Sequence, residues 1–276
     1  PASNFELRAL RDIYVALNDS SNVVSNLTLT GFVGGLERYE PAANVEMQIE
    51  GTLTVLGGIV SADASNQGQI KINAQSVSTD GASVFIGDRM DVTASGAIGL
   101  NTLLAKISAV STGTGDIVVN ESDSLIVELM VARDGKIDIF TGDTTYIREV
   151  RNNVDASGKN ITLRVGGNVF IDSIEAATDA GANKRFGSVL VESTGLVREW
   201  EAQITDANGN VVSTAYDQTA ADLYGKDVTV IVPSIAANFG TVSNTQPKRL
   251  MFSGDSGLGS EIEVRVVGAY AQTTEG

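Results

Sequence analysis

Apolar and polar residues alternate in short runs along this chain, and many of the runs follow a glycine. The recurring phrase is a glycine, one or two polar residues, and two aliphatic residues separated by one position. The aliphatic pairs are Leu53/Val55, Ile70/Ile72, Ile117/Val119, Ile137/Ile139, Ile161/Leu163, Val189/Val191, Val228/Val230 and Ile262/Val264. A period of two places the aliphatic pair on one face of a strand and the polar residues on the other. The phrase therefore predicts β-strands with one buried side and one solvated side.

The phrase is an internal repeat, which indicates a stacked architecture. The first aliphatic residues of successive phrases are Ile117, Ile137, Ile161 and Val189, at steps of about 20, 24 and 28 residues, as expected when loops of different length join a fixed rung. Further short strands are predicted between phrases, for example at 84–86 and 169–171, so each rung has two or three strands. Stacking the rungs at roughly 4.8 Å buries the aliphatic residues in continuous ladders.

The predicted fold is therefore all-β, a parallel β-helix (β-solenoid) with irregular rungs of roughly 20–28 residues and one projecting β-hairpin. A β-sandwich or barrel is the less favoured alternative. Such folds show a hairpin turn at most connections, and the only strong two-residue hairpin signal here is Asn208-Gly209.

Four segments follow from this pattern. Residues 1–44 are expected to form irregular first rungs or a capping segment, and residues 45–195 hold the clearest repeats. Residues 196–216 read as two alternating arms around Asn208-Gly209, which predicts the projecting hairpin. The glycine phrase returns in residues 217–276, where the solenoid is expected to continue with longer loops.

The predicted hairpin contains the only tryptophan of the chain, Trp200, with Tyr216 near its base. One interpretation is that Trp200 packs over the flank of the solenoid. The other is that Trp200 and Tyr216 form an aromatic anchor for another subunit or for a sugar.

Composition removes several classes of chemistry. The chain has no cysteine and no histidine, which excludes disulfides, thiolate catalysis and histidine-based triads or metal sites. The net charge is −15 and the basic residues form no cluster, so nucleic acid is not expected as a partner. No stretch approaches the roughly 20 apolar residues of a membrane span. No cofactor is predicted beyond weak calcium binding at acidic corners, since no complete calcium loop is present.

One enzymatic alternative stays open. β-Helices can carry carboxylates and basic residues on an outer face, and Asp138, Asp143, Arg148, Glu149 and Arg151 fall in adjacent predicted strands. A solvated face has the same composition, so a non-enzymatic role is preferred. Asn-x-Ser/Thr triplets, which can accept glycans in some hosts, occur at Asn18, Asn26, Asn120 and Asn160.

The repeats of residues 45–195, such as Gly115-Asp-Ile117-Val-Val119 followed by a small-residue turn and another aliphatic strand, resemble those of filamentous-haemagglutinin-like large exoproteins and related bacterial adhesins. The resemblance implies a right-handed parallel β-helix, export from a Gram-negative-type cell, and a role in attachment or matrix building. The Asn-Pro-Asn-Gly segments of that family's secretion module do not occur in this sequence.

The expected function is a non-enzymatic, extracellular structural or adhesive β-solenoid, secreted or on a bacterial cell surface, that forms a stiff rod or an end-to-end fibre. Its expected partners are neighbouring copies of itself, flanking domains of a longer polypeptide, or surface carbohydrate. The first alternative is a carbohydrate-active β-helix of the polysaccharide lyase or hydrolase type. The second is a viral tail or capsid component.

Overall fold

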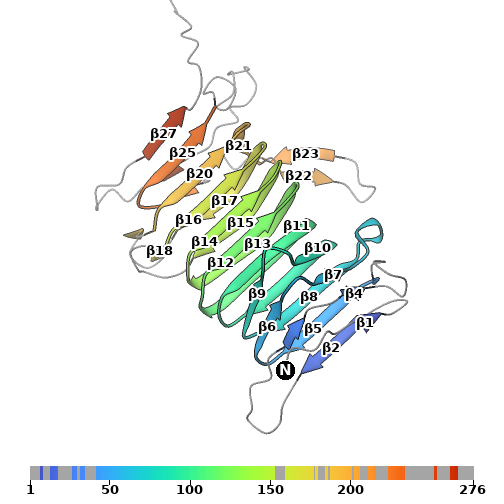
Figure 1. Ribbon diagram of the computed structural model, residues 1–276. Coiled ribbons are helices and arrows are strands. Elements are labelled where there is room, and N and C mark those ends of the chain that lie inside the picture. Colours follow the sequence, from blue (N-terminus) through green and yellow to red (C-terminus); the bar gives the residue numbers. More distant parts are fainter. Residues whose placement is uncertain are drawn as a thin grey trace, which may run out of the picture.

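The computed structural model is an all-β protein whose strands stack in parallel as a β-solenoid (Figure 1). Its one short helical turn in the described residues is η1 (Ala64–Asn66). The residues that the structure describes are 7–8, 13–17, 27–29, 32–34, 42–152, 159–176, 178–179, 184–185, 187–200, 202–205, 211–215, 223–233, 252–253 and 262–266. The parallel β-helix predicted from the repeated phrase is confirmed.

Each full coil contributes strands to three faces, called here the first, second and third face in chain order. The first face stacks β3 (Leu27–Leu29), β6 (Thr52–Val55), β9 (Ser76–Thr79), the start of β11 (Ile98–Thr114), β12 (Ile117–Glu121), β14 (Ile137–Thr141), β16 (Ile161–Val165), β20 (Val189–Ser193), β25 (Val228–Val232) and β27 (Ile262–Val266).

The second face stacks β1 (Leu7–Arg8), β4 (Phe32–Gly34), β7 (Ile59–Ser61), the start of β10 (Val84–Ala94), the middle of β11, the starts of β13 (Leu125–Asp134), β15 (Thr145–Asn152) and β17 (Val169–Glu175), and β21 (Val197–Glu199). The third face stacks β2 (Ile13–Leu17), β5 (Val45–Ile49), β8 (Gln69–Ala74), the ends of β10, β11, β13, β15 and β17, then β24 (Leu223–Tyr224) and β26 (Phe252–Ser253).

The glycine phrase marks the first face. Ile117 is in register with Ile137, which is in register with Ile161, and the ladder continues through Val189, Val228 and Ile262. The exception is the phrase at Ile70/Ile72, which lies in β8 on the third face. A similar glycine-led pattern therefore serves two different sides of the solenoid.

The long strands bend where the second face meets the third. In β15 the inward–outward alternation is interrupted by two successive outward residues, Arg148 and Glu149, before Val150 is buried. The same double outward step occurs at 88–89, 105–106, 128–129 and 172–173. Since two consecutive side chains cannot both point outward on a flat strand, each of these pairs marks a corner of the coil.

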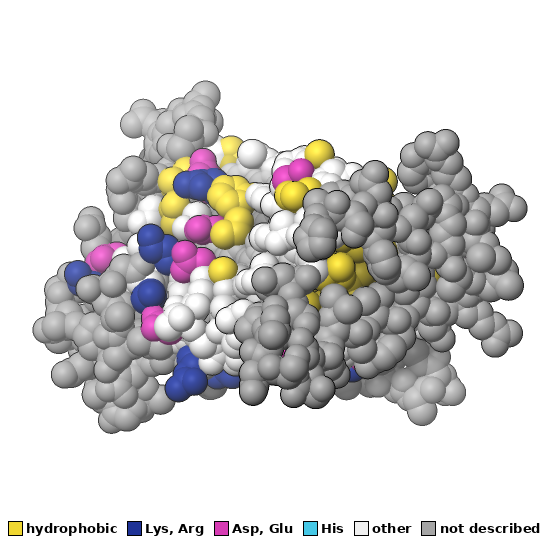
Figure 2. All heavy atoms as spheres, turned by 60° about the horizontal axis from the view of Figure 1, so that its bottom comes forward, with side chains coloured by type: hydrophobic (Ala, Val, Ile, Leu, Met, Phe, Trp, Pro, Cys, Tyr) yellow, Lys and Arg dark blue, Asp and Glu magenta, His cyan; other side chains and the backbone are white. Residues whose placement is uncertain are grey.

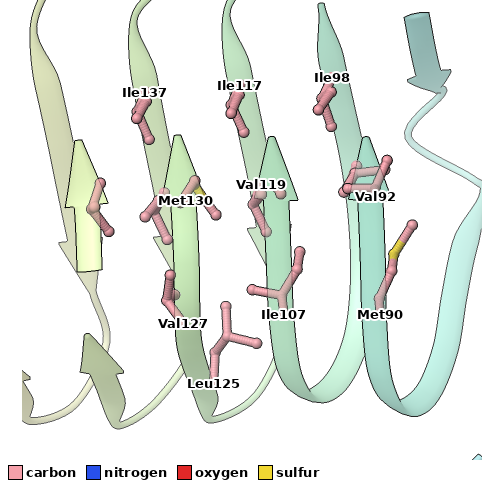
Figure 3. Packing of buried hydrophobic residues seen from close by; sticks show 14 of the residues in the cluster. Met90, Val92, Ile98, Ile107, Ile117, Val119, Leu125, Val127, Met130 and Ile137 are labelled. Atoms are coloured by element: carbon pink, nitrogen blue, oxygen red, sulfur yellow. The ribbon is translucent and has the colours of Figure 1, made fainter. Parts of the chain in front are cut away.

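Aliphatic side chains from all three faces fill the interior. Figure 3 shows Ile98, Ile117 and Ile137 in line on successive coils, with Met90, Ile107 and Met130 lining another side of the same core. Each such side chain is essentially inaccessible to solvent. Burial of a single isoleucine or methionine stabilises a fold by about 1.5–3 kcal/mol, so the coil-to-coil ladders supply the main driving force for this fold.

Two antiparallel hairpins lie outside this parallel stack. The first pairs β22 (Ala202–Thr205) with β23 (Val211–Ala215), and the second pairs β18 (Thr178–Asp179) with β19 (Lys184–Arg185). β21, which belonged to the first arm of the hairpin expected at 196–216, is instead in register with β17 in the solenoid. In the described part of the chain, no helix has both the length and the apolar character needed to cross a bilayer.

Candidate functional site

An aromatic cluster lies on the outer side of the second face. Tyr146 of β15 and Phe170 of β17 are register partners, and their rings stack with centroids 4.8 Å apart and an angle of 10° between planes. The backbone N–H of Trp200 donates a hydrogen bond to the Ile171 carbonyl at 2.7 Å. The centroid of the Trp200 ring lies 5.8 Å from that of the Tyr146 ring, and the two rings are tilted by 57°. Trp200 therefore lies against the flank of the solenoid.

The stacking of Tyr146 and Phe170 limits what this cluster can bind. The Tyr146 and Phe170 rings come from successive coils and each covers one face of the other, so a ligand cannot pack on those two faces. Tyr216, the other aromatic residue expected in an anchor, lies outside the described residues. The ring that Trp200 contacts, Tyr146, was not predicted because it comes from an earlier coil and its place depends on the register of β15, β17 and β21.

A second feature is a depression of about 390 Å³ at the corner between the first and second faces, called here the corner notch. It is lined by Gly81, Ala82, Ser83, Val84, Asn101, Thr102, Asn120, Glu121, Ser122, Phe140 and Thr141. Sequence reasoning did not predict it.

The corner notch results from a difference between neighbouring coils. β11 runs through this corner without a break, whereas the coil before it turns at 80–83 and the coil after it turns at 122–124. Residues of both turns line the notch on either side of the straight strand. The signal in the sequence is the absence of a glycine or an Asp-Ser turn between Leu100 and Leu104, where the other coils have one.

Glu121 occupies the interior of the corner notch. The residue is only 4% exposed, and its carboxylate accepts hydrogen bonds from the Leu104 N–H at 2.8 Å and from the Asp123 N–H at 3.1 Å. Burial raises the pKa of Glu121, and the hydrogen bonds from Leu104, Thr102 and Asp123 oppose that rise. One acidic group therefore bridges the straight coil and the following turn.

A polar ladder forms one wall of the corner notch. Asn120 Nδ2 donates to Asn101 Oδ1 at 3.0 Å, and Asn101 Nδ2 donates to the Asp80 carbonyl. The next residue on this ladder is Phe140, and after it comes Arg164, whose guanidinium lies over the Phe140 ring at 5.4 Å from the centroid. Arg164 therefore covers the ring from the following coil, while Phe140 itself lines the notch beside Asn120.

The charged residues considered for catalysis are spread around the coil. Asp138 lies in β14 on the first face, and Asp143 is in the turn that follows this strand. Arg148 is at the corner of the second and third faces, and Glu149 forms an ion pair with Arg151 at 2.9 Å. These side chains do not converge on one point. No group of three or more acidic residues in the described ranges is placed to hold a metal ion.

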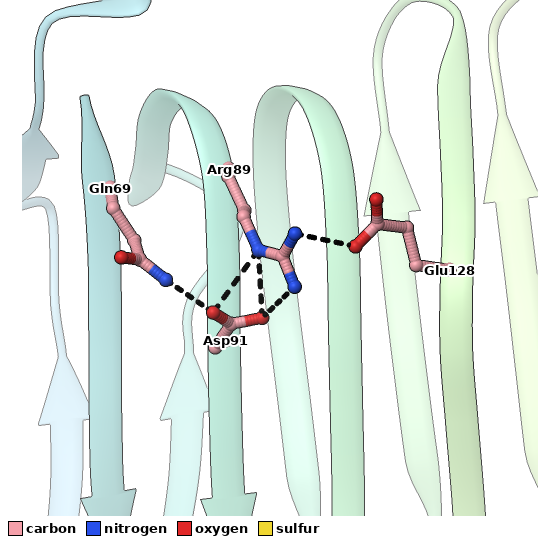
Figure 4. A network of polar contacts seen from close by, with 4 residues as sticks. All are labelled: Gln69, Arg89, Asp91 and Glu128. Carbon is pink, nitrogen blue, oxygen red and sulfur yellow. Dashed lines mark hydrogen bonds and ion pairs between the residues drawn. The ribbon is translucent and has the colours of Figure 1, made fainter. Parts of the chain in front are cut away.

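The outer third face carries a polar network that connects several coils (Figure 4). Arg89 of β10 contacts Asp91 on its own strand at 3.1 Å and Glu128 of β13 at 2.7 Å, and Gln69 of β8 donates to Asp91. Figure 2 likewise shows basic side chains mixed among acidic ones on the face in view. Such cross-coil pairing reduces the repulsion that stacking like charges would cause.

The Asn-x-Ser/Thr triplets have unequal surroundings. Asn120 is exposed, although its amide is bonded to Asn101, and the Asn160 side-chain oxygen accepts from the Ser188 N–H at 3.0 Å. Asn18 and Asn26 lie outside the described residues. Modification of any of the four stays a prediction.

Comparison of this chain with protein-family models, with curated proteins and with solved structures found no match.

Proposed function

We propose that this chain is a non-enzymatic structural and adhesive β-solenoid segment of a cell surface or the extracellular space, acting as a stiff rod or as the subunit of an end-to-end fibre. The observation that carries the proposal is the continuous parallel register of the first face from Leu27 in β3 to Val266 in β27. Strand hydrogen bonds then run along the rod axis, and bending the rod means straining them.

The two ends of the stack support the fibre form of this proposal. Among the described strands, β1, β2 and β3 each pair on one side only, with β4, β5 and β6. At the other end β26 and β27 pair only with β24 and β25 in the described part of the chain. A strand edge of this kind is a template for pairing with another chain, and a second copy offers the complementary edge.

The charge of the chain is consistent with a soluble rod. The chain has a net charge of −15, and pairs such as Lys71–Glu46 and Arg164–Glu192 join successive coils at 3.5 and 3.2 Å. The excess charge favours solubility, while the paired charges lie along the stack. The resemblance of the repeats to large bacterial exoproteins supports a surface location.

The hydrolase or lyase alternative has less support. Hydrolysis of a glycosidic bond commonly needs two carboxyl groups on either side of the scissile bond. Among the described residues that line the corner notch, Glu121 is the only ionisable one, and two backbone N–H groups hold it. This arrangement suits binding better than cleavage.

Negative-stain electron microscopy of the full chain and of two deletion variants, lacking 1–44 or 260–276, tests the proposal. We expect rods or fibres for the full chain. Where fibres form, either deletion should shorten them while circular dichroism still reports β-structure. Fibres unchanged by both deletions would contradict assembly through these ends. Compact particles, closed trimers, or sugar release from polysaccharide by the pure protein would contradict the proposed function itself.

A further inference from the structure

We propose that the corner notch binds one neutral pyranose ring of a glycan. The inference rests on the adhesive part of the proposed function and names its ligand class. It is carried by the shape of the notch, its aromatic wall and the polar groups around it.

The shape suits a ring and little more. The volume of about 390 Å³ is within the range of small-molecule sites, and the depression is bounded along the rod by the turns at 80–83 and 122–124. Thr102 and Glu121, both buried, form the floor of the notch. The site is thus built by the fold and does not depend on side chains closing over it.

The aromatic wall supplies an apolar surface. Phe140 is half-buried and lines the notch, with the Arg164 guanidinium over its ring. A pyranose has an apolar face of C–H groups with a ring of hydroxyls at its edge, so it can pack on an aromatic face while its hydroxyls reach polar partners. The outward positions before Phe140 on this ladder are Asn120 and Asn101, which place amides beside the ring.

The polar groups match hydroxyls and do not match an anion. Asn101 and Asn120 each have an amide oxygen and an amide nitrogen, Ser122 is an exposed hydroxyl, and Glu121 is an acceptor at the floor. Neither lysine nor arginine is among the described residues lining the notch, and the whole chain is strongly acidic. Phosphate, sulfated sugars and uronic acids are therefore disfavoured, and a neutral sugar is the class that fits.

Saturation-transfer NMR on the full chain tests the proposal. The probes are methyl glycosides of glucose, galactose, mannose, N-acetylglucosamine and N-acetylgalactosamine, together with lactose, cellobiose and diacetylchitobiose, and glucuronate serves as the anionic control. We expect transfer to the C–H protons of at least one neutral sugar, with a Kd on the order of 1 mM, and none to glucuronate.

The variant Phe140→Leu should weaken that binding by about three- to tenfold, since an aromatic contact contributes about 0.5–1.5 kcal/mol. Phe170→Leu is the matched control: Phe170 is also a half-buried outward phenylalanine on a solenoid ladder, but it stacks on Tyr146 and lies outside the notch. It should leave binding unchanged.

Three results would overturn the inference: no transfer to any neutral sugar at about 10 mM, equal weakening by both variants, or preferential binding of glucuronate. These outcomes are separate from failure of the proposed function, because rods or fibres seen by microscopy would remain whatever the NMR shows. Compact particles in the microscope together with sugar binding would contradict the proposed rod but support the inference, and would indicate a lectin-like module.

Discussion

The Glu121 carboxylate accepts a hydrogen bond from the Leu104 N–H at 2.8 Å, although the two residues belong to different coils. Leu104 lies where β11 passes straight through a corner at which neighbouring coils make a turn. Its N–H is buried beside the core, and an unpaired buried donor is costly. The side chain of Glu121 provides the acceptor.

Removal of this carboxylate should destabilise the solenoid. Glu121→Ala leaves the Leu104 N–H without this acceptor, and we expect a loss of about 1–3 kcal/mol in the free energy of unfolding measured with urea. Glu192→Ala is the control, because Glu192 makes a solvent-exposed ion pair with Arg164 and such pairs contribute about 0–1 kcal/mol. Equal losses of unfolding free energy in the two variants would show that the hydrogen bond from the Leu104 N–H stabilises the fold no more than an exposed ion pair does.

The same residue predicts a pH effect on stability. Burial raises the pKa of Glu121, so the folded state holds its proton more tightly than the unfolded chain does. The stabilisation from this proton is complete below the unfolded pKa and is lost as the pH rises through the folded pKa.

The test compares the wild type with Glu121→Gln, which cannot titrate at this position. The free energy of unfolding of the wild type minus that of the variant should fall as the pH rises above about 4.3, the usual pKa of a glutamate in an unfolded chain. Urea denaturation at several pH values measures this difference. A difference that is constant, or that grows with pH, would contradict the assigned direction of the shift.

Glycine is required at some corners and tolerated at others. A Cβ on Gly135 would collide with the backbone carbonyl of Gly115 in the preceding coil, whereas a Cβ on Gly81 would meet nothing within 4 Å. Gly135→Ala should therefore cost about 1–3 kcal/mol, as overpacking does elsewhere. Gly81→Ala should change the thermal unfolding midpoint little. A similar shift in both variants would mean that the coils are not spaced as closely as described.

The alternation on the first face predicts opposite effects for adjacent residues. Ile117 is fully buried in the core ladder, and its neighbour Val118 points outward and is half-buried. Truncation of Ile117 to alanine should cost about 2–5 kcal/mol, while Val118→Ala should cost less than about 1 kcal/mol. Urea denaturation of the two variants measures this contrast. A larger loss of stability in Val118→Ala than in Ile117→Ala would mean that Val118, and not Ile117, faces the core.

Much of this fold follows from local sequence. The aliphatic pairs at Ile117, Ile137 and Ile161 predict the first face because each pair alternates within one strand and follows a glycine by two or three residues. The second and third faces were harder to separate, since a single strand such as β15 serves both and bends at Arg148 and Glu149 without a glycine or proline. A period-two pattern cannot distinguish such a corner from a strand end.

The candidate site could not be predicted in the same way. The corner notch depends on a turn that one coil lacks, and Glu121 gains its partner Leu104 only when two coils stack. Trp200 was singled out as the one tryptophan, but its contact with Tyr146 depends on register across strands far apart in the chain. Both relationships belong to the stack of coils and not to any one strand.

Cryo-electron microscopy of the full chain at high concentration tests the central claim, a stiff rod with coils stacked along its length, most directly. The proposal predicts elongated particles whose power spectrum shows a layer line near 4.8 Å, the strand spacing, along the long axis. Globular particles, or elongated particles with that spacing perpendicular to the long axis, would contradict the claim.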